Sequence, residues 1–308
     1  MIDTPRITVI GESLVDVVVT PYSRREFPGG SPMNVAVGLG RLGSSVAIAT
    51  SIGTDERGVR LRDHLLGSGV ELVPGSVVDG STSTSTAHID SSGAARYEFD
   101  IEWSLAAVHQ MPSSPIVHTG SIASFLSPGA DDVEGYMVDA RSRAVTTFDP
   151  NIRASLIDSR QRTIDRVEAV AAASCVVKMS DEDSDWLYPG RPFDWVLSHL
   201  LELGSTLVIL TKGESGSELG TASTRVRLPS KRVIVADTIG AGDSYMSGVI
   251  HSLDQLLLSP ADRDSIIGGT TFTETVLTDF GTFAASCAGL TVSRFGADPP
   301  TLAEVGRD

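Results

Sequence analysis

Short runs of β-branched and other apolar residues alternate with helical patterns along the chain up to residue 210, and this alternation narrows the choice of fold more than any other pattern in the sequence. Strand-like runs lie at 7–10, 46–49, 115–118, 145–148, 175–178 and 206–210. Helix-like patterns lie between them, at 32–42, 55–67, 129–142, 181–188 and 192–203. Alternation of this kind is typical of a parallel sheet with helices on both faces. The sequence therefore predicts an α/β fold with a mainly parallel central sheet.

Two segments do not fit this alternation, at about 14–28 and about 82–103. Neither fits a βα unit, and the second alternates polar and apolar side chains about a Ser-Ser-Gly turn at 91–93. We expect the two segments to form a small β-sheet that projects as a lid from one domain spanning 1–308. The alternative is that they are edge strands of the main sheet.

The pattern changes again after residue 211. Residues 224–228 and 233–235 have the composition of two antiparallel strands around Pro229, and helical patterns follow at 242–258 and 276–292. We therefore expect the carboxyl-terminal third of the chain to add antiparallel strands and two long helices.

Charge and hydropathy exclude several classes of partner. The 308 residues include 24 Lys and Arg against 39 Asp and Glu, a formal net charge of −15 that does not suit binding to a nucleic-acid backbone. No run approaches the roughly 18 consecutive apolar residues of a membrane span, and the first residues lack the features of a signal peptide. Cys175 and Cys287 lie in apolar runs, as expected in a reducing compartment. We expect a soluble, cytoplasmic protein with no membrane or nucleic-acid partner.

The sequence lacks the motifs of several other common classes of enzyme. The histidines show no metal-ligand spacing, and neither a P-loop nor a Gly-x-Ser-x-Gly motif occurs. The Gly-x-Gly-x-x-Gly match at 38–43 lies inside a predicted helix, not between a strand and a helix. These absences argue against zinc, P-loop, serine-hydrolase and nicotinamide chemistry.

Polar residues and glycines follow three of the predicted strands, at 149–153, 178–180 and 211–216. Ligands of open parallel sheets bind outside the carboxyl ends of the strands. We therefore expect the ligand-binding cleft on that edge of the sheet.

Residues 237–243, Asp-Thr-Ile-Gly-Ala-Gly-Asp, precede a long helical pattern. Gly240 and Gly242 allow backbone N–H groups to converge at a helix N-terminus, a site that favours an anion such as a phosphoryl group. Asp243 beside such a site is suited to take a proton from an attacking hydroxyl. An Asp is also a common helix N-cap, so residue type leaves both roles open.

Residues 29–34, Gly-Gly-Ser-Pro-Met-Asn, form the second informative segment. Ser31 as N-cap and Pro32 at the first helical position predict the start of a helix. The paired Gly29 and Gly30 allow a ligand to approach the backbone closely, and Asn34 offers a donor and an acceptor for the hydroxyl groups of a polyol.

With these two segments, the sequence resembles the PfkB (ribokinase-like) family of carbohydrate kinases, most closely its bacterial fructokinases. The supporting segments follow the order of the family: 11–16, 29–34, 51–55, 148–153, 178–183 with 186–189, 211–213, 240–243 and 291–296. The resemblance implies a ribokinase-like three-layer αβα sandwich whose small β-sheet lid closes over the sugar and excludes water.

The resemblance also implies roles for individual residues. Asp243 would be the catalytic base, with the amides of Gly240, Ala241 and Gly242 stabilising the transferring phosphoryl group. The residues on the sugar side would be Asp16, Gly29, Gly30 and Asn34. Arg153 would neutralise phosphate or reach the sugar. The residues on the nucleotide side would be Lys178, Ser180, Thr211, Gly213 and Gly216.

Some positions depart from the family pattern. Asp183 stands where relatives carry a Glu associated with Mg²⁺ through water, so Asp183 would take that role on a shorter arm. Many relatives carry an Asn in the helix over the adenine, where Ser286 or Cys287 would have to form the wall. Backbone carbonyls would form a K⁺ site around Asp237, Thr291, Arg294 and Gly296.

The predicted reaction is an ATP-dependent phosphorylation of a primary sugar hydroxyl, D-fructose to D-fructose 6-phosphate, with ATP, Mg²⁺ and K⁺ as the cofactors. Another PfkB substrate stays open, namely 2-keto-3-deoxygluconate, ribose, another ketose or a nucleoside. A sugar-binding relative without catalysis is the alternative from a different class. The alternating segment 94–101 also predicts a homodimer that pairs through the lid.

Overall fold

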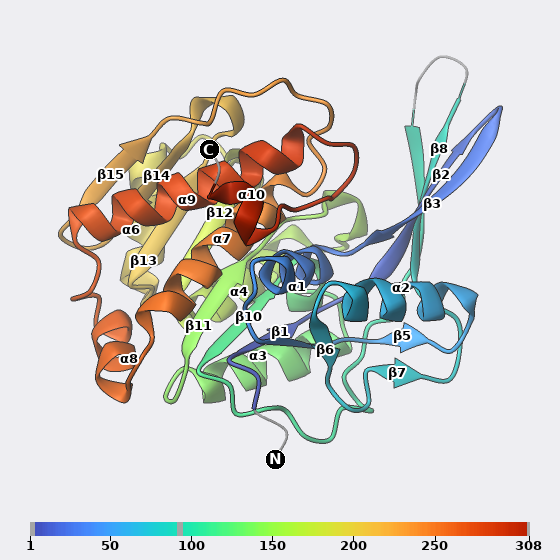
Figure 1. Ribbon diagram of the computed structural model, residues 1–308, viewed down its shortest axis with the longest axis horizontal. Helices are drawn as coiled ribbons and strands as arrows, with labels where there is room; N and C mark the ends of the chain where they lie inside the picture. Colours follow the sequence, from blue (N-terminus) through green and yellow to red (C-terminus); the bar gives the residue numbers. More distant parts are fainter. Residues whose placement is uncertain (1–3, 91–94, 307–308) are drawn as a thin grey trace.

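The computed structural model describes residues 4–90 and 95–306. Its main sheet has nine strands in the order β15-β14-β13-β12-β11-β10-β1-β4-β6 (Figure 1). Their bounds are β1 Ile7–Ile10, β4 Val46–Ala49, β6 Val70–Leu72, β10 Ile116–Gly120, β11 Val145–Asp149, β12 Val176–Ser180, β13 Leu207–Thr211, β14 Ser217–Gly220 and β15 Arg225–Leu228. Within this sheet, the neighbouring strands β13, β12, β11, β10, β1, β4 and β6 all pair in parallel. β14 pairs antiparallel with β13 and with β15. The predicted mainly parallel α/β sheet is confirmed.

The strand predicted at 233–235 is wrong, because no regular structure forms there. The antiparallel partner of β15 is β14, which follows β13 through the short 3₁₀ turn η3, Gly213–Ser215. Ile234 and Val235 are 91% and 61% exposed, so these β-branched side chains have no sheet to pack against. A strand also needs a neighbouring edge to satisfy its backbone, and a local pattern cannot supply that neighbour.

Helices cover both faces of the main sheet (Figure 1). Their bounds are α1 Ser31–Arg41, α2 Glu56–Gly67, α3 Gly129–Ala140, α4 Arg160–Ala172, α5 Asp181–Leu187, α6 Phe193–Leu203, α7 Ala241–Leu256, α8 Pro260–Ile267, α9 Glu274–Val292 and α10 Leu302–Val305. Side chains alternate between the faces of each strand. On β13, Leu207 and Ile209 pack in the core with α1, α7 and α9, whereas Val208 and Leu210 pack with α3, α4 and α6. The predicted three-layer sandwich is confirmed.

Three helices, α4, α8 and the short α10, were not predicted from the sequence, although α4 carries recognisable signals. Ser159 caps α4 by accepting a hydrogen bond from the Arg162 amide, and Thr163, Val167 and Val170 form its buried stripe. α9 is long and apolar enough to cross a membrane by length and composition alone. In this fold α9 packs along α7, so its apolar face belongs to the core.

A separate four-stranded sheet, called here the small sheet, has the order β3-β2-β8-β9. Its strands are β2 Leu14–Thr20, β3 Ser23–Gly29, β8 Thr84–Ile89 and β9 Ala95–Asp100. Figure 1 shows it projecting from one side of the α/β body. The two interrupting segments therefore form a sheet of their own, and the edge-strand alternative is wrong. The expected turn at 91–93 lies outside the described residues.

Two further strands, β5 Ile52–Gly53 and β7 Val77–Val78, form a short parallel pair beside α2. Asp55, directly after β5, caps α2 and also accepts hydrogen bonds from the backbone and hydroxyl of Thr82. Thr82 lies just before β8. The junction between the body and the small sheet is therefore tied to the start of α2.

Candidate active site

A cleft of about 450 Å³ opens at the carboxyl ends of β10, β11, β12 and β13, on the edge of the sheet where the sequence predicted it. The start of α7 forms part of its wall, and Ser85 and Phe99 of the small sheet face it. The predicted site residues that line it are Asp16, Gly30, Asn34, Arg153, Lys178, Ser180, Asp183, Thr211, Gly213, Gly240, Ala241, Gly242 and Asp243. Residues far apart in the sequence thus meet in one cleft.

The Gly-Ala-Gly turn starts α7. Gly240 is the N-cap residue with a φ of 76°, and a side chain there would also press on Ala297. Only glycine adopts such a left-handed conformation without strain. Gly240, Ala241 and Gly242 line the cleft, and the start of α7 has no side-chain cap, although the Ala241 amide donates to the Thr238 carbonyl at 3.3 Å. An uncapped helix N-terminus attracts anions.

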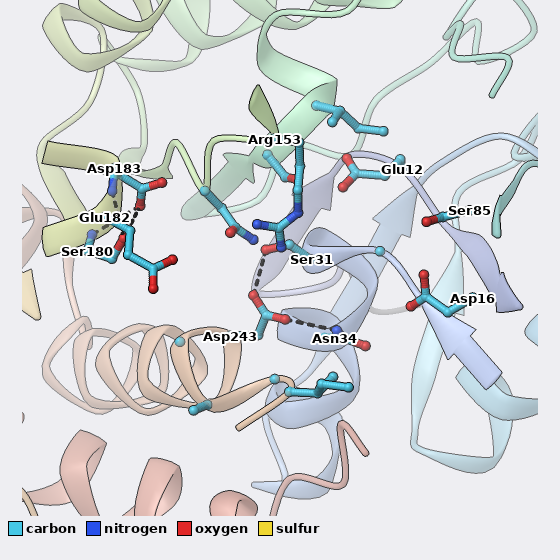
Figure 2. Close-up of a pocket in the computed structure, with 18 of the residues that line it drawn as sticks. Glu12, Asp16, Ser31, Asn34, Ser85, Arg153, Ser180, Glu182, Asp183 and Asp243 are labelled. Atoms are coloured by element: carbon cyan, nitrogen blue, oxygen red, sulfur yellow. Dashed lines mark hydrogen bonds between the residues drawn. The ribbon is translucent and has the colours of Figure 1, made fainter. Parts of the chain in front are cut away.

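Asp243 lies in the first turn of α7 and does not cap it, so the N-cap alternative is wrong. Its carboxylate turns to the start of α1. There Oδ1 accepts a hydrogen bond of 2.6 Å from Ser31 Oγ, and Oδ2 accepts one of 2.8 Å from Asn34 Nδ2 (Figure 2). Asp243 is 8% exposed but lines the cleft. The role of Ser31 as an N-cap is also wrong: α1 begins at Ser31 itself, with Gly30 as its N-cap and Pro32 in its first turn.

Lys178 lies behind the glycine turn in a buried ion pair. Its ammonium contacts Asp149 Oδ2 at 2.8 Å, and a Cβ at Gly242 would lie 2.9 Å from the same nitrogen. Burial raises the pKa of Asp149 to about 6, although the Lys178 charge opposes the rise. Burial acts to lower the pKa of Lys178, but the Asp149 carboxylate outweighs it and the pKa is raised. Lys178 is therefore a fixed cation at the start of α7.

Two carboxyl groups lie toward the small sheet, the buried Glu12 and the half-buried Asp16. Burial raises the pKa of Asp16 to about 6, with the Asp243 charge adding to the rise and the Arg153 charge opposing it. Burial raises the pKa of Glu12 to about 8. Gly29 packs under Asp16, because a Cβ there would lie 2.1 Å from Asp16 Oδ2. Figure 2 shows Glu12 and Asp16 on the side of the cleft opposite Asp183.

Asp183 lies at the nucleotide end predicted for the cleft, but its carboxylate also serves the fold. Oδ2 accepts hydrogen bonds from the amide and hydroxyl of Ser180 in a capping box at the start of α5, and Oδ1 accepts one from the Ile152 amide. The neighbouring Glu182 is exposed and reaches into the cleft (Figure 2). No group of three metal-ligating side chains occurs within residues 4–90 and 95–306.

The residues of the predicted K⁺ site lie together behind the glycine turn. Asp237 Oδ2 accepts a hydrogen bond from the Gly296 amide at 2.9 Å, and the Arg294 amide donates to the Thr291 carbonyl at 3.0 Å. The Arg294 guanidinium pairs with Glu304 and does not line the cleft. Arg294 can therefore contribute only backbone groups to the predicted K⁺ site.

The proposed wall at Cys287 is wrong. Its side chain is fully buried with Leu42 and Val305, and burial raises the pKa of the thiol to about 12. The position faces α7, because a Cβ on Gly248 would lie 3.3 Å from Cys287 Sγ. Ser286 is half-buried and does not line the cleft, and neither does Gly216, which packs against Leu228.

Several residues that line the cleft have no binding or catalytic role in the sequence-based prediction: Glu12, Ser31, Ser85, Phe99, Ser121, Asn151 and Glu182. Ser121 and Asn151 have φ values of 55° and 36°, a strained region for residues other than glycine. Such strain is concentrated at functional sites. Both follow the ends of adjacent strands, β10 and β11, so their place after a strand was the available signal.

Comparisons with known proteins agree with this geometry. The model of the pfkB family of carbohydrate kinases matches residues 4–303. A fructokinase from Rhizobium leguminosarum bv. trifolii is 32% identical over 261 residues, covering 80% of this chain and 80% of the relative. The crystal structure of a fructokinase with bound ATP from Xylella fastidiosa has a TM-score of 0.83 and 25% identity, covering 98% of this chain and 97% of that one.

A fructokinase variant from Vibrio cholerae, in its fructose-, ADP- and potassium-bound form, has a TM-score of 0.79 and 21% identity, covering 99% of each chain. At that identity the likeness concerns the fold. The family model spans nearly the whole chain, and its span includes the cleft, the glycine turn and Asp243. This chain belongs to the pfkB family of carbohydrate kinases and is an ATP-dependent phosphotransferase that acts on a sugar hydroxyl.

Proposed function

We propose that this kinase phosphorylates D-fructose at its primary 6-hydroxyl. The observation that carries the proposal is the place of Asp243, which lines the cleft from the first turn of α7, directly after Gly240, Ala241 and Gly242. A base and an anion site are thereby side by side, as in-line phosphoryl transfer requires. The fructokinase from Rhizobium leguminosarum bv. trifolii supports fructose as the acceptor.

In the proposed mechanism, Asp243 takes the proton of the 6-hydroxyl as the sugar oxygen bonds to the γ-phosphorus of ATP. The bond from that phosphorus to the bridging oxygen breaks, and ADP leaves with the electron pair. The amides of the glycine turn stabilise charge on the transferring group. The ammonium of Lys178, held by Asp149, adds a positive charge at the same helix terminus.

The two ends of the cleft would hold the two substrates. Toward the small sheet, Asp16 and Asn34 offer polar groups to the sugar hydroxyls. Toward β13, Ser180, Thr211 and Gly213 form the nucleotide side. Arg153 lies exposed between the ends and forms no ion pair with any residue that the structure describes, so its charge is available to phosphate.

The acidic residues at the start of α5 fit Mg²⁺ that is carried mainly by ATP. Mg²⁺ keeps several waters and binds kinase sites through one or two carboxylates and the substrate phosphates. Asp183 and Glu182 provide carboxylates beside the cleft, with Asp183 held in place by Ser180 and Ile152. When bound, the ion would offset negative charge on the phosphates. Carbonyls of the loops at 237 and 291–296 would hold K⁺ beside the glycine turn.

The small sheet would act as the lid of this cleft, because Ser85 and Phe99 already line it. Closure would exclude water from the phosphoryl group and limit hydrolysis of ATP. We also place the protein in the cytoplasm, where ATP and free sugars are available and the two buried thiols stay reduced.

The test is ADP formation over a panel of acceptors at fixed ATP and Mg²⁺, with and without K⁺. The panel contains fructose, ribose, other ketoses, 2-keto-3-deoxygluconate, nucleosides and fructose 6-phosphate. We expect fructose to have the highest kcat/KM and the product to carry phosphate at C6. A higher kcat/KM for another acceptor would replace fructose. Tight fructose binding by calorimetry without ADP formation would instead identify a sugar-binding relative.

A further inference from the structure

Ser31 contacts the proposed base although no catalytic role has been given to it. It is the first residue of α1, 6% exposed, and its hydroxyl donates to Asp243 Oδ1 at 2.6 Å (Figure 2). Because Gly30 occupies the N-cap position and α1 has no side-chain cap, this hydroxyl does not serve the helix. The two residues are 212 positions apart in the sequence. The contact is therefore a tertiary one between the starts of α1 and α7.

Both oxygens of Asp243 are held from the same helix. Asn34, one turn after Ser31, donates from Nδ2 to Oδ2 at 2.8 Å. Each carboxylate oxygen has two acceptor positions, so each keeps one that can face the cleft. The carboxylate is thus fixed in orientation before a sugar enters, and its second acceptor positions stay available to a hydroxyl.

The two donors respond differently when Asp243 gains a proton. A hydroxyl can donate or accept, and it changes from one to the other by rotating a single hydrogen. The NH₂ group of an amide only donates, so Asn34 would have to turn its whole amide over to accept. Both contacts survive protonation when the proton takes an acceptor position that faces the cleft, and the Ser31 hydroxyl can in addition accept a hydrogen bond, which the Asn34 NH₂ group cannot do.

The geometry points to Ser31 as a positioning residue that holds the Asp243 carboxylate so that its free acceptor positions face the sugar hydroxyl. This inference rests on the proposed role of Asp243 as the base. Before transfer, the Ser31 hydroxyl donates to Oδ1. During transfer the proton passes from the sugar hydroxyl to a cleft-facing acceptor position of the Asp243 carboxylate, the sugar oxygen uses its electron pair to bond phosphorus, and ADP leaves with the pair of the broken bond. Afterwards the new O–H lies on the cleft side of the carboxyl group, and the Ser31 hydroxyl still donates to Oδ1.

Three variants test this role by steady-state kinetics with fructose as the varied substrate. Ser31→Ala removes the contact, and we expect kcat to fall on the order of ten- to a hundred-fold, the effect of losing one hydrogen bond to a charged group. The KM for fructose should stay within about two-fold, because the lost contact is to the base and not to the sugar. Ser31→Cys keeps a weak donor and acceptor, so its kcat should lie between those of Ser31→Ala and the unaltered enzyme.

The matched control is Ser247→Ala. Ser247 is a buried serine of the same α7, but its hydroxyl donates to the Ser244 carbonyl and does not contact Asp243. We expect kcat and KM close to those of the unaltered enzyme. Thermal unfolding of all three variants shows whether they are folded, and Ser31→Cys alone supplies the comparison if Ser31→Ala does not fold.

A double variant shows whether Ser31 acts through Asp243. In single-turnover experiments, adding Ser31→Ala to Asp243→Asn should change the residual rate by less than about two-fold. An equal loss in both backgrounds, an unchanged kcat in Ser31→Ala, or a rise in KM that accounts for the whole loss would overturn the inference. Failure of the proposed function has a different result: the unaltered enzyme would not phosphorylate fructose, or Asp243→Asn would keep its turnover.

Discussion

At the scale of single residues, the cleft is organised around one buried cation. Lys178 contacts Asp149, and the charges of Asp183 and Asp243 also act on it. Removing one partner of a buried pair leaves an uncompensated charge that destabilises a protein by about 3–5 kcal/mol. Substitution of Lys178 would therefore confound turnover with folding. Asp243 is a cleaner site for substitution because its partners are neutral donors.

Asp243→Asn should lower kcat by about 10²–10⁴-fold, the usual contribution of a general base. The amide has the shape of the carboxylate and still offers Ser31 an acceptor, and Asn34 can accept from the new NH₂ group by turning its own amide over. The midpoint of thermal unfolding should therefore change little. Steady-state kinetics and calorimetric unfolding on the same preparation check both expectations. Turnover within ten-fold of the unaltered enzyme would reject Asp243 as the base.

Glu12 makes stability depend on pH. Burial raises its folded-state pKa to about 8, whereas the pKa of a glutamate in the unfolded chain lies near 4.5. Between these values the unfolded state has lost the proton that the folded state keeps, so the free energy of unfolding falls as pH rises from about 5 to 8. Glu12→Gln mimics the neutral form and should flatten this decline. Urea unfolding at pH 5, 6.5 and 8 measures this free energy for both proteins. An equal fall in the free energy of unfolding with pH in the two proteins would contradict the prediction.

At the scale of elements, the small sheet is attached to the body through charge as well as chain. Glu26 of β3 accepts hydrogen bonds from Arg57 and Arg60 of α2, and these bonds lower the pKa of Glu26 to about 2. The contact joins an element of the proposed lid to an element of the body. The contact should therefore restrict the movement of the small sheet relative to the cleft.

Glu26→Gln should loosen the small sheet from α2. We expect faster amide hydrogen exchange in β2 and β3, and more ATP hydrolysis per sugar phosphorylated, because water reaches the phosphoryl group more often. Glu98→Gln is the matched control, since Glu98 of β9 pairs with His88 inside the same sheet. Equal effects of the two substitutions would mean that the Glu26 contact does not restrain the sheet.

At the scale of the whole molecule, the projecting sheet leaves β3 and β9 as its outer strands (Figure 1). Tyr97 of β9 is 58% exposed and stacks on Phe99, with 6.2 Å between the ring centroids. Phe99 is half-buried, so Tyr97 is the exposed aromatic residue of this outer strand, and such a residue suits pairing with a second chain. This placement supports the prediction of a homodimer through the lid.

Light scattering should give twice the chain mass of 32.4 kDa for the unaltered protein and the monomer mass for Tyr97→Arg. The charge would remain exposed in the monomer but would have to be desolvated in the paired sheet. Tyr22→Arg is the control, because Tyr22 lies in the turn between β2 and β3 and is 93% exposed. A monomer at all concentrations would contradict the predicted pairing.

The sequence by itself determined the central strands of the fold, the start of α7 and the edge of the sheet that holds the cleft. The six central strands and the start of α7 at the glycine turn follow from local patterns, because alternation and left-handed glycine positions depend on neighbours in the chain. Polar residues after strands indicated the edge that holds the cleft, since parallel strands end on the same side.

Only the tertiary structure decided which side chains meet. The 233–235 segment has a strand-like composition but no neighbouring edge, and Cys287 turns to the core instead of the cleft. The tertiary structure also decided the position of Asp243, because its residue type alone left the roles of base and helix N-cap equally open. Its contact with Ser31 crosses 212 positions, and the distance between residues so far apart depends on how the whole sheet and its helices pack.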